Sequence, residues 1–193
     1  MEKYSVILAD PPWTYSNSGC RGAAANEYPT MSLEELKMLP VENMANDDCV
    51  LLMWATWPKL DEACLPLMKA WGFEYITAFP WIKITDISKT LWGKLEIKVP
   101  YGVGFWARGC SEPLLIGRRG KPKSPPNGFI GLLSPNLFHS RKPDDIYHYA
   151  ESMPGPYLEL FARRARSGWD VWGNEVDGID LFVPTGEKVE GYY

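Results

Sequence analysis

Short apolar segments rich in β-branched residues alternate along this chain with segments of helical periodicity. This alternation constrains the fold more than any other feature. Strands are expected over residues 4–10, 48–56, 75–84, 112–117, 157–163 and 169–174, and helices over 32–40, 58–71 and 142–152. Strands that alternate with helices predict an α/β layered fold with a mostly parallel sheet. Neither a repeat nor a linker interrupts residues 1–193, so we expect one domain.

The remaining segments are expected to be loops. Residues 14–30 form a polar stretch rich in glycine and alanine, and loops of that length in compact domains are often functional. Residues 85–110 are expected to be irregular, and residues 118–136 to form a basic loop rich in proline and glycine. Ser32 and Glu35 have the spacing of a capping box, which predicts the start of the first helix.

Composition and charge exclude several classes of protein. No apolar run approaches the roughly 18–20 residues that cross a membrane. Without a basic leader before a long apolar region, we expect a cytoplasmic protein that binds no membrane. The four cysteines form no CxxC pair and there are two histidines, so we expect free thiols and no metal site. The net charge of −4 argues against a general polyanion binder.

Polar side chains stand where three of the predicted strands end. Asp10 follows the first strand, Glu159 and Arg163 belong to the strand over residues 157–163, and Asn174 precedes Glu175 at the end of the last strand. Ligands of open α/β sheets bind beyond the carboxyl ends of the strands. These residues are therefore the first candidates for a binding site.

The tetrapeptide Asp10-Pro11-Pro12-Trp13 carries the strongest chemical signal. An adenine amine is a poor nucleophile, and a carboxylate with a backbone carbonyl could accept its N–H bonds and draw the nitrogen toward tetrahedral geometry. Asp10 and the carbonyl of Pro11 suit these roles, because prolines supply no competing N–H donors. Trp13 could stack on an extruded base. The spacing alone fits a proline-stiffened turn equally well.

Seven segments in series resemble the DPPW-type adenine-N(6) methyltransferases, the family of the seventy-kilodalton subunit of the messenger-RNA adenosine methyltransferase. These segments are DPPW at 10–13, EYPTMS at 27–32, LLMWAT at 51–56, GFEYITAFPWIK at 72–83, GVGFWARGCSEPLLIGRRG at 102–120, HSRKPDDIY at 139–147 and YLELFARRARSGWDVWGNE at 157–175. The resemblance covers nearly the whole chain in the family's order. It implies a Rossmann-like fold, permuted so that the catalytic strand precedes the cofactor strand, and transfer of a methyl group from S-adenosyl-L-methionine to adenine.

The resemblance also implies roles for individual residues. The catalytic set is Asp10, Pro11, Pro12 and Trp13, and Asp10 could also touch the cofactor. The cofactor pocket would include Glu159, Leu160 and Arg163, with Asn174 and Glu175 on the ribose and adenosine portion and Lys142 facing the methionine carboxylate. Tyr28 would lie in a loop that closes over the target adenosine, and His139 and Ser140 in a gating loop near the substrate. Glu112 matches a glutamate typical of the family, with either a structural or a substrate-side role.

Nucleic acid is the expected partner, and it requires positive surface. A first basic cluster comprises Arg118, Arg119, Lys121 and Lys123, and a second comprises Arg163, Arg164 and Arg166. We expect the first cluster to hold the phosphate backbone. DNA is favoured because the chain is short and lacks RNA-binding additions. The alternatives are the same reaction on RNA, or an inactive subunit that binds nucleic acid for a partner.

Overall fold

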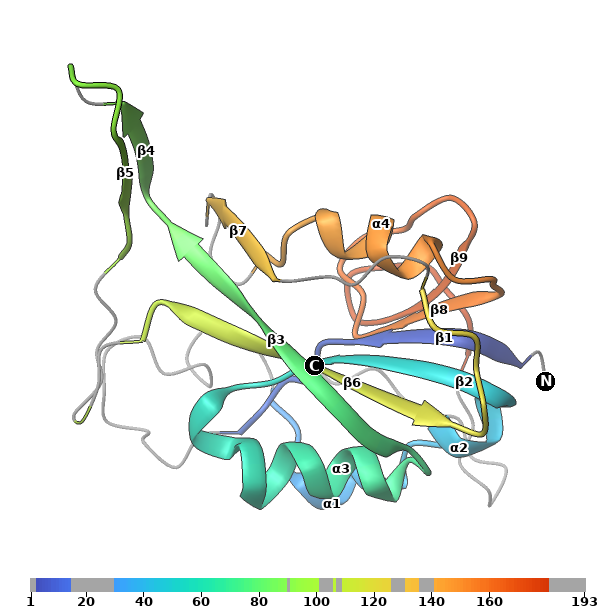
Figure 1. Cartoon of the computed structure of the whole chain (residues 1–193). Coiled ribbons are helices and arrows are strands. Elements are labelled where there is room, and N and C mark those ends of the chain that lie inside the picture. Colours follow the sequence, from blue (N-terminus) through green and yellow to red (C-terminus); the bar gives the residue numbers. More distant parts are fainter. Residues whose placement is uncertain are drawn as a thin grey trace.

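The structure, a computed structural model, describes residues 3–14, 30–89, 91–100, 106, 109–125, 131–135 and 141–180. Seven strands form a mixed sheet in the order β7-β3-β6-β2-β1-β8-β9 (Figure 1). In chain order the strands are β1 Tyr4–Ala9, β2 Ala45–Trp54, β3 Glu74–Ile84, β6 Ser111–Arg119, β7 Leu132–Pro135, β8 Tyr157–Leu160 and β9 Trp169–Trp172. Together with the helices on its faces, this sheet confirms the predicted α/β class.

The sheet is parallel except at one strand. β1 pairs in parallel with β2 and β8, and β8 pairs in parallel with β9. β6 runs antiparallel to both β2 and β3, so β3 points the same way as β1. The carboxyl ends of β1, β2, β3, β8 and β9 therefore meet at one edge of the sheet. β1, the first strand along the chain, lies inside the sheet between β2 and β8, the latter a strand from much later in the sequence.

Alternating side chains of the central strands build two cores, one on each face of the sheet. Ile7 and Ala9 of β1 face the helices α1 (Leu33–Met38), α2 (Val41–Met44) and α3 (Leu65–Ala70). Val6 and Leu8 face the opposite core, which contains Ile146 of α4 (Asp145–Glu151). Figure 1 shows α1 and α3 below the sheet and α4 above it. Both faces are covered, which explains why the central strands are continuously apolar.

The first predicted helix begins where the sequence predicts, but α4 begins at Asp145 rather than Lys142, and the helix predicted between them is not a single α-helix. Ser32 caps α1 in a capping box with Glu35, as predicted. The helix expected over residues 58–71 consists of a 3₁₀ turn at Trp57–Lys59, a π-helical turn at Leu60–Cys64, and then α3. Pro66 lies in the first turn of α3, where its lack of an N–H group costs no hydrogen bond within that α-helix.

Two expectations about loops are wrong. Residues 85–110 include a hairpin, β4 (Asp86–Lys89) paired with β5 (Leu95–Lys98). The basic loop expected over residues 118–136 includes β7. Arg118 and Arg119 belong to β6, because they continue its pairing with Cys49 and Val50 of β2. Within the described ranges, no helix is long and apolar enough to span a membrane.

Candidate active site

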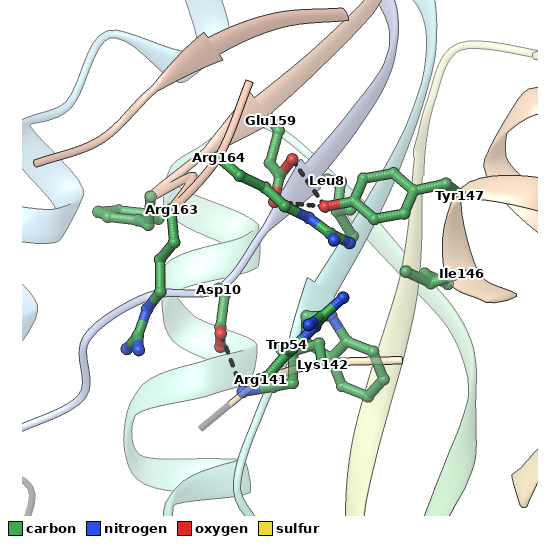
Figure 2. Close-up of a pocket in the computed structure, with 11 residues that line it drawn as sticks. Leu8, Asp10, Trp54, Arg141, Lys142, Ile146, Tyr147, Glu159, Arg163 and Arg164 are labelled. Carbon is green, nitrogen blue, oxygen red and sulfur yellow. Dashed lines mark hydrogen bonds and ion pairs between the residues drawn. The ribbon is translucent and has the colours of Figure 1, made fainter. Parts of the chain in front are cut away.

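A cavity of about 250 Å³ opens at the carboxyl edge of the sheet, where β1 and β8 end beside α4 (Figure 2). Its walls combine apolar side chains with both signs of charge, as expected for a site that binds a polar small molecule. The lining residues are Leu8, Asp10, Trp54, Arg141, Lys142, Ile146, Tyr147, Glu159, Phe161, Arg163 and Arg164. Asp10, Lys142, Glu159 and Arg163 were predicted from sequence to lie together, and the fold brings them together.

The ammonium group of Lys142 joins two carboxylates from different strands. Its Nζ lies 2.9 Å from Oδ2 of Asp10 and 3.3 Å from Oε2 of Glu112, which belongs to β6. Glu112 also pairs with Lys83 near the end of β3. Burial alone would lower the pKa of Lys142, but the two carboxylates outweigh it and raise that pKa above its usual range. Lys142 is therefore a permanent cation that fixes the position of Asp10.

Glu112 is held in its charged form by the same contacts. Burial favours the protonated carboxyl, yet the charges of Lys142 and Lys83 lower the pKa of Glu112 below its usual value. Both ammonium groups also lie over aromatic rings, Lys142 over Trp54 at 5.6 Å and Lys83 over Trp81 at 5.0 Å. The four charged groups Asp10, Lys142, Glu112 and Lys83 thus form a continuous, electrically balanced chain across the carboxyl edge.

Glu159 and Tyr147 form the opposite wall of the cavity. The Tyr147 hydroxyl donates to the Glu159 carboxyl, at 3.0 Å from Oε1 and 2.9 Å from Oε2. Burial raises the pKa of Glu159 to about 7, although the Tyr147 hydrogen bond acts to lower it. The negative charge of Asp10 adds to the increase. This carboxyl therefore changes charge near neutral pH.

The backbone that leaves β8 is strained at the cavity. Phe161 has a φ angle of 65°, in the left-handed region that residues with a side chain rarely adopt. Its ring packs edge-on against Trp172 of β9, with centroids 5.3 Å apart. Conformations of this kind cost about 1–3 kcal/mol and concentrate at functional sites. At Phe161 the turn keeps an apolar ring in the cavity wall while the chain continues toward Arg163 and Arg164.

The catalytic tetrapeptide is ordered by backbone hydrogen bonds. The Pro11 carbonyl accepts from the Trp13 N–H at 2.9 Å, and the Pro12 carbonyl accepts from the Met31 N–H at 3.0 Å. A carbonyl oxygen has two lone pairs, so Pro11 retains acceptor capacity. Trp13 is only 6% exposed and packs in the core below the sheet, which leaves little of its ring for stacking on a base.

The other predicted cofactor residues, Leu160, Asn174 and Glu175, are not among the residues that line the cavity. The Leu160 side chain is fully buried in the core, so a contact with a ligand would come from its backbone. Glu175 approaches Arg163, with 3.9 Å between the Oε1 and Nε atoms. The Asn174 Oδ1 atom is buried without a hydrogen-bond partner among the described residues. An unpaired buried acceptor is costly, which supports a ligand at Asn174.

Several predicted substrate residues are not brought to this cavity. Tyr28, His139 and Ser140 lie outside the described residues. Arg118 pairs with Glu74 at 3.0 Å, and Arg119 donates to the Glu42 carbonyl at 2.6 Å. Both pair with the middle of β2, at Val50 and Cys49, and Val50 in turn pairs with Val6 near the start of β1, four residues before Asp10. A phosphate-binding role for Arg118, Arg119, Lys121 and Lys123 stays a prediction, and none of the four lines the cavity.

Sequence reasoning missed several residues of the cavity. Tyr147 and Trp54 lie inside a predicted helix and a predicted strand, where aromatic residues are usually core, and nothing local marked them. Arg141 adjoins Lys142, and Arg164 was assigned only to a basic cluster. The partnership of Glu112 with Lys142 joins positions 30 residues apart, and no local pattern indicated it. No group of three or more potential ligands for a metal ion occurs in the described part of the chain.

A family model described as MT-A70 matches residues 4–175. The chain belongs to the MT-A70 family. This result confirms the resemblance seen in the sequence, the Rossmann-like fold class and the assignment as a methyltransferase. Methyltransferases of this family depend on S-adenosyl-L-methionine in general.

Relatives from distant organisms show the same likeness. The chain is 32% identical to the type II methyltransferase M.MunI of a Mycoplasma species, over 98% of this chain and 84% of the relative. It is 29% identical to the N(6)-adenine-specific methyltransferase METTL4 of Mus musculus, covering 93% of this chain and 40% of the relative. The N6-methyladenosine RNA methyltransferase MTA1 of Cryphonectria parasitica is also 29% identical, with 90% and 52% covered. The chain thus spans most of the first relative and about half or less of the other two.

Proposed function

We propose that this protein transfers a methyl group from S-adenosyl-L-methionine to the exocyclic amine of adenine in DNA. One observation carries the proposal. Asp10 of the Asp-Pro-Pro-Trp tetrapeptide lines a cavity whose wall carries both signs of charge, fixed by Lys142 at 2.9 Å, in a chain of the MT-A70 family. Relatives named for N(6)-adenine and N6-methyladenosine methylation support the choice of acceptor atom.

The cavity fits S-adenosyl-L-methionine in its chemistry. Glu159 lines the cavity and can accept hydrogen bonds from ribose hydroxyls or the adenosine amine. The unpaired Oδ1 atom of Asn174, which is not part of the cavity lining, offers a second acceptor. Arg163, Arg164 and Lys142 supply cations for a carboxylate. When bound, the cofactor supplies an activated methyl group on a sulfonium. Lys142 already binds two carboxylates, so a third would share its donors or displace Glu112.

The residues of this chain position the acceptor amine. Lys142 binds Oδ2 of Asp10, which leaves Oδ1 to accept one N–H bond of the amine. The remaining lone pair of the Pro11 carbonyl can accept the other. Two acceptors hold the nitrogen so that its lone pair points at the methyl carbon, and such positioning can supply several kcal/mol of catalysis. The Asp10 carboxylate is also the nearest acceptor for the proton that the amine loses.

DNA is proposed over RNA because the chain nearly spans a type II methyltransferase, whereas it covers about half of the relative named for RNA. The test gives the protein S-adenosyl-L-methionine with matched DNA and RNA oligonucleotides, single- and double-stranded. Hydrolysed products are then analysed by mass spectrometry for N(6)-methyladenine.

We expect methylated adenine in DNA, lost in the Asp10→Asn variant. If the protein methylates RNA alone, the substrate is RNA instead of DNA, and the proposed methyl-transfer reaction still stands. If wild-type protein binds the cofactor but methylates neither, the proposed activity is wrong.

A further inference from the structure

The β4–β5 hairpin stands apart from the rest of the described structure. Figure 1 shows it projecting beyond the sheet as an extension of β3. Its two strands pair only with each other, from Asp86 with Lys98 to Lys89 with Leu95. An isolated two-stranded hairpin is marginally stable in water. A projection of this kind gains stability from whatever it contacts.

The root of the hairpin is joined to the catalytic carboxylate. Lys83, three residues before β4, binds Glu112, which binds Lys142, which binds Asp10. The Thr85 N–H also donates to the Lys98 carbonyl at 2.8 Å and closes the hairpin base. The hairpin is therefore fixed at the edge of the sheet where a substrate of Asp10 must arrive.

The register of the sheet shows how far the hairpin extends. Leu114 of β6 pairs both with Trp54, the last residue of β2, and with Phe79 of β3. β3 therefore continues for five residues past the end of β2 before the hairpin starts. At about 3.3 Å per residue, the tip lies roughly 30 Å along the chain from the level of Trp54. A nucleic acid duplex rises 3.4 Å per base pair, so this reach corresponds to about nine base pairs.

The tip of the hairpin carries two large apolar side chains between two cations. Leu91 and Trp92 are fully exposed, at 102% and 94%, and Lys89 and Lys94 flank them. Proteins that insert into a nucleic acid groove use such apolar wedges, and tryptophan stacks on bases of any sequence. Lysine is depleted from protein–protein interfaces, so this tip suits a polyanion better than a protein.

We propose that the β4–β5 hairpin is an arm that grips duplex DNA beside the target adenine, with Leu91 and Trp92 entering a groove. The inference rests on the proposed function for the position of the adenine at Asp10. Along the arm, Ile87 and Ile97 are half-exposed cross-strand partners that contact with the duplex would cover. Asp86 is neutralised by Lys98 at the root, and Glu96 is the second carboxylate of the arm.

The test measures binding of fluorescein-labelled duplexes of ten and thirty base pairs, by anisotropy, with S-adenosylhomocysteine present. The double variant Leu91→Ala/Trp92→Ala is expected to bind the long duplex roughly five- to 150-fold more weakly, the range of base–aromatic stacking. Its affinity for the short duplex, which carries the target adenine at its centre, should stay within twofold, since only about five base pairs, about 17 Å, then extend toward the tip. Trp92→Phe should retain most of the affinity. Met38→Ala, which changes an exposed apolar residue of α1, is the matched control.

Three results would overturn the proposal that the hairpin is a DNA-binding arm. The double variant could bind the long duplex like wild type, or lose both duplexes equally. It could also become a monomer by sedimentation where wild type is a dimer, with DNA affinity unchanged, which would make the hairpin a protein interface. Methyl transfer by wild type, measured separately, distinguishes failure of the arm from failure of the proposed function. If wild type is inactive but binds only the long duplex tightly, the result supports the proposed arm and contradicts the proposed enzyme activity.

Discussion

Glu159→Gln tests the electrostatics of the cavity more directly than any other substitution. The pKa of Glu159 lies at about 7 in the folded protein, against an ordinary value of 4.5. At about 1.4 kcal/mol per pKa unit, ionising this carboxyl in the fold costs about 3 kcal/mol. Glutamine keeps the shape of the side chain and cannot ionise. The variant therefore removes the cost of the charge and little else.

The raised pKa fixes the sign of the effect on stability. The pKa of Glu159 is higher in the folded protein than in the unfolded chain. The protonated carboxyl therefore contributes fully to the free energy of unfolding below about pH 4.5, and this contribution is lost as the pH rises through about 7. Glu159→Gln should match wild type at pH 4.5 and exceed its free energy of unfolding by up to about 3 kcal/mol at pH 8. Urea unfolding followed by tryptophan fluorescence at both values measures the difference. Glu96→Gln, at an exposed carboxyl of β5, is the control.

The negative charge of Glu159, which lowers the stability of the fold, should raise the affinity for the cofactor. An ionised Glu159 accepts two hydrogen bonds from ribose hydroxyls, so wild-type affinity for S-adenosylhomocysteine should rise about tenfold per pH unit up to about pH 7 and then level off. The glutamine variant should bind weakly at every pH. Calorimetry from pH 5.5 to 8.5 gives both profiles. Equal stability of wild type and variant at pH 8, together with a flat wild-type binding profile, would refute the reasoning.

Three further predictions concern the charged groups of the site and the distant basic cluster. Asp10→Ala should lower kcat by about 10²–10³ or more while cofactor affinity stays within about tenfold, since Asp10 acts on the amine. Single-turnover assays measure the loss of activity and calorimetry measures the cofactor affinity. Activity within threefold of wild type would contradict this prediction. Lys142→Met and Asn174→Ala should each weaken cofactor binding by about 1–3 kcal/mol in the same calorimetry. Lys121→Ala/Lys123→Ala should lower the salt slope of DNA binding by about 0.9 per lost contact if these cations hold phosphates, and an unchanged slope would assign them to solvent.

The sequence allowed us to locate those site residues that stand at the carboxyl end of a single apolar strand. Asp10 and Glu159 stand at or near the ends of apolar strands, and parallel strands bring such ends to one edge, so their meeting could be predicted. The capping box at Ser32 needs only residues three apart. These features have short-range causes, and the structure confirms their positions.

Features that depend on pairing between distant segments could not be predicted in the same way. Arg118 and Arg119 have the composition of a loop, but pairing of both with β2, and of Arg118 with β3, extends β6 through them. The alternation Leu95-Glu96-Ile97-Lys98 is a strand signal that nearby glycines and lysines obscured. Trp13 was predicted to face a base, but whether its ring points to the core depends on packing below the sheet. The contact of Glu112 with Lys142 arises only after β6 and the start of α4 have come together.

The central position of β1 has a consequence for synthesis of the chain. β1 is made before the other strands of the sheet, yet its partner β8 begins at Tyr157, so one side of this apolar strand stays unpaired until the long intervening segment has been made. An unpaired apolar edge is a template for aggregation. A chain that stops before β8 should therefore be trapped by chaperones or lost as aggregate, with no soluble half-enzyme. Ribosomes stalled before Tyr157 would hold a nascent chain in which β1 still presents this open edge.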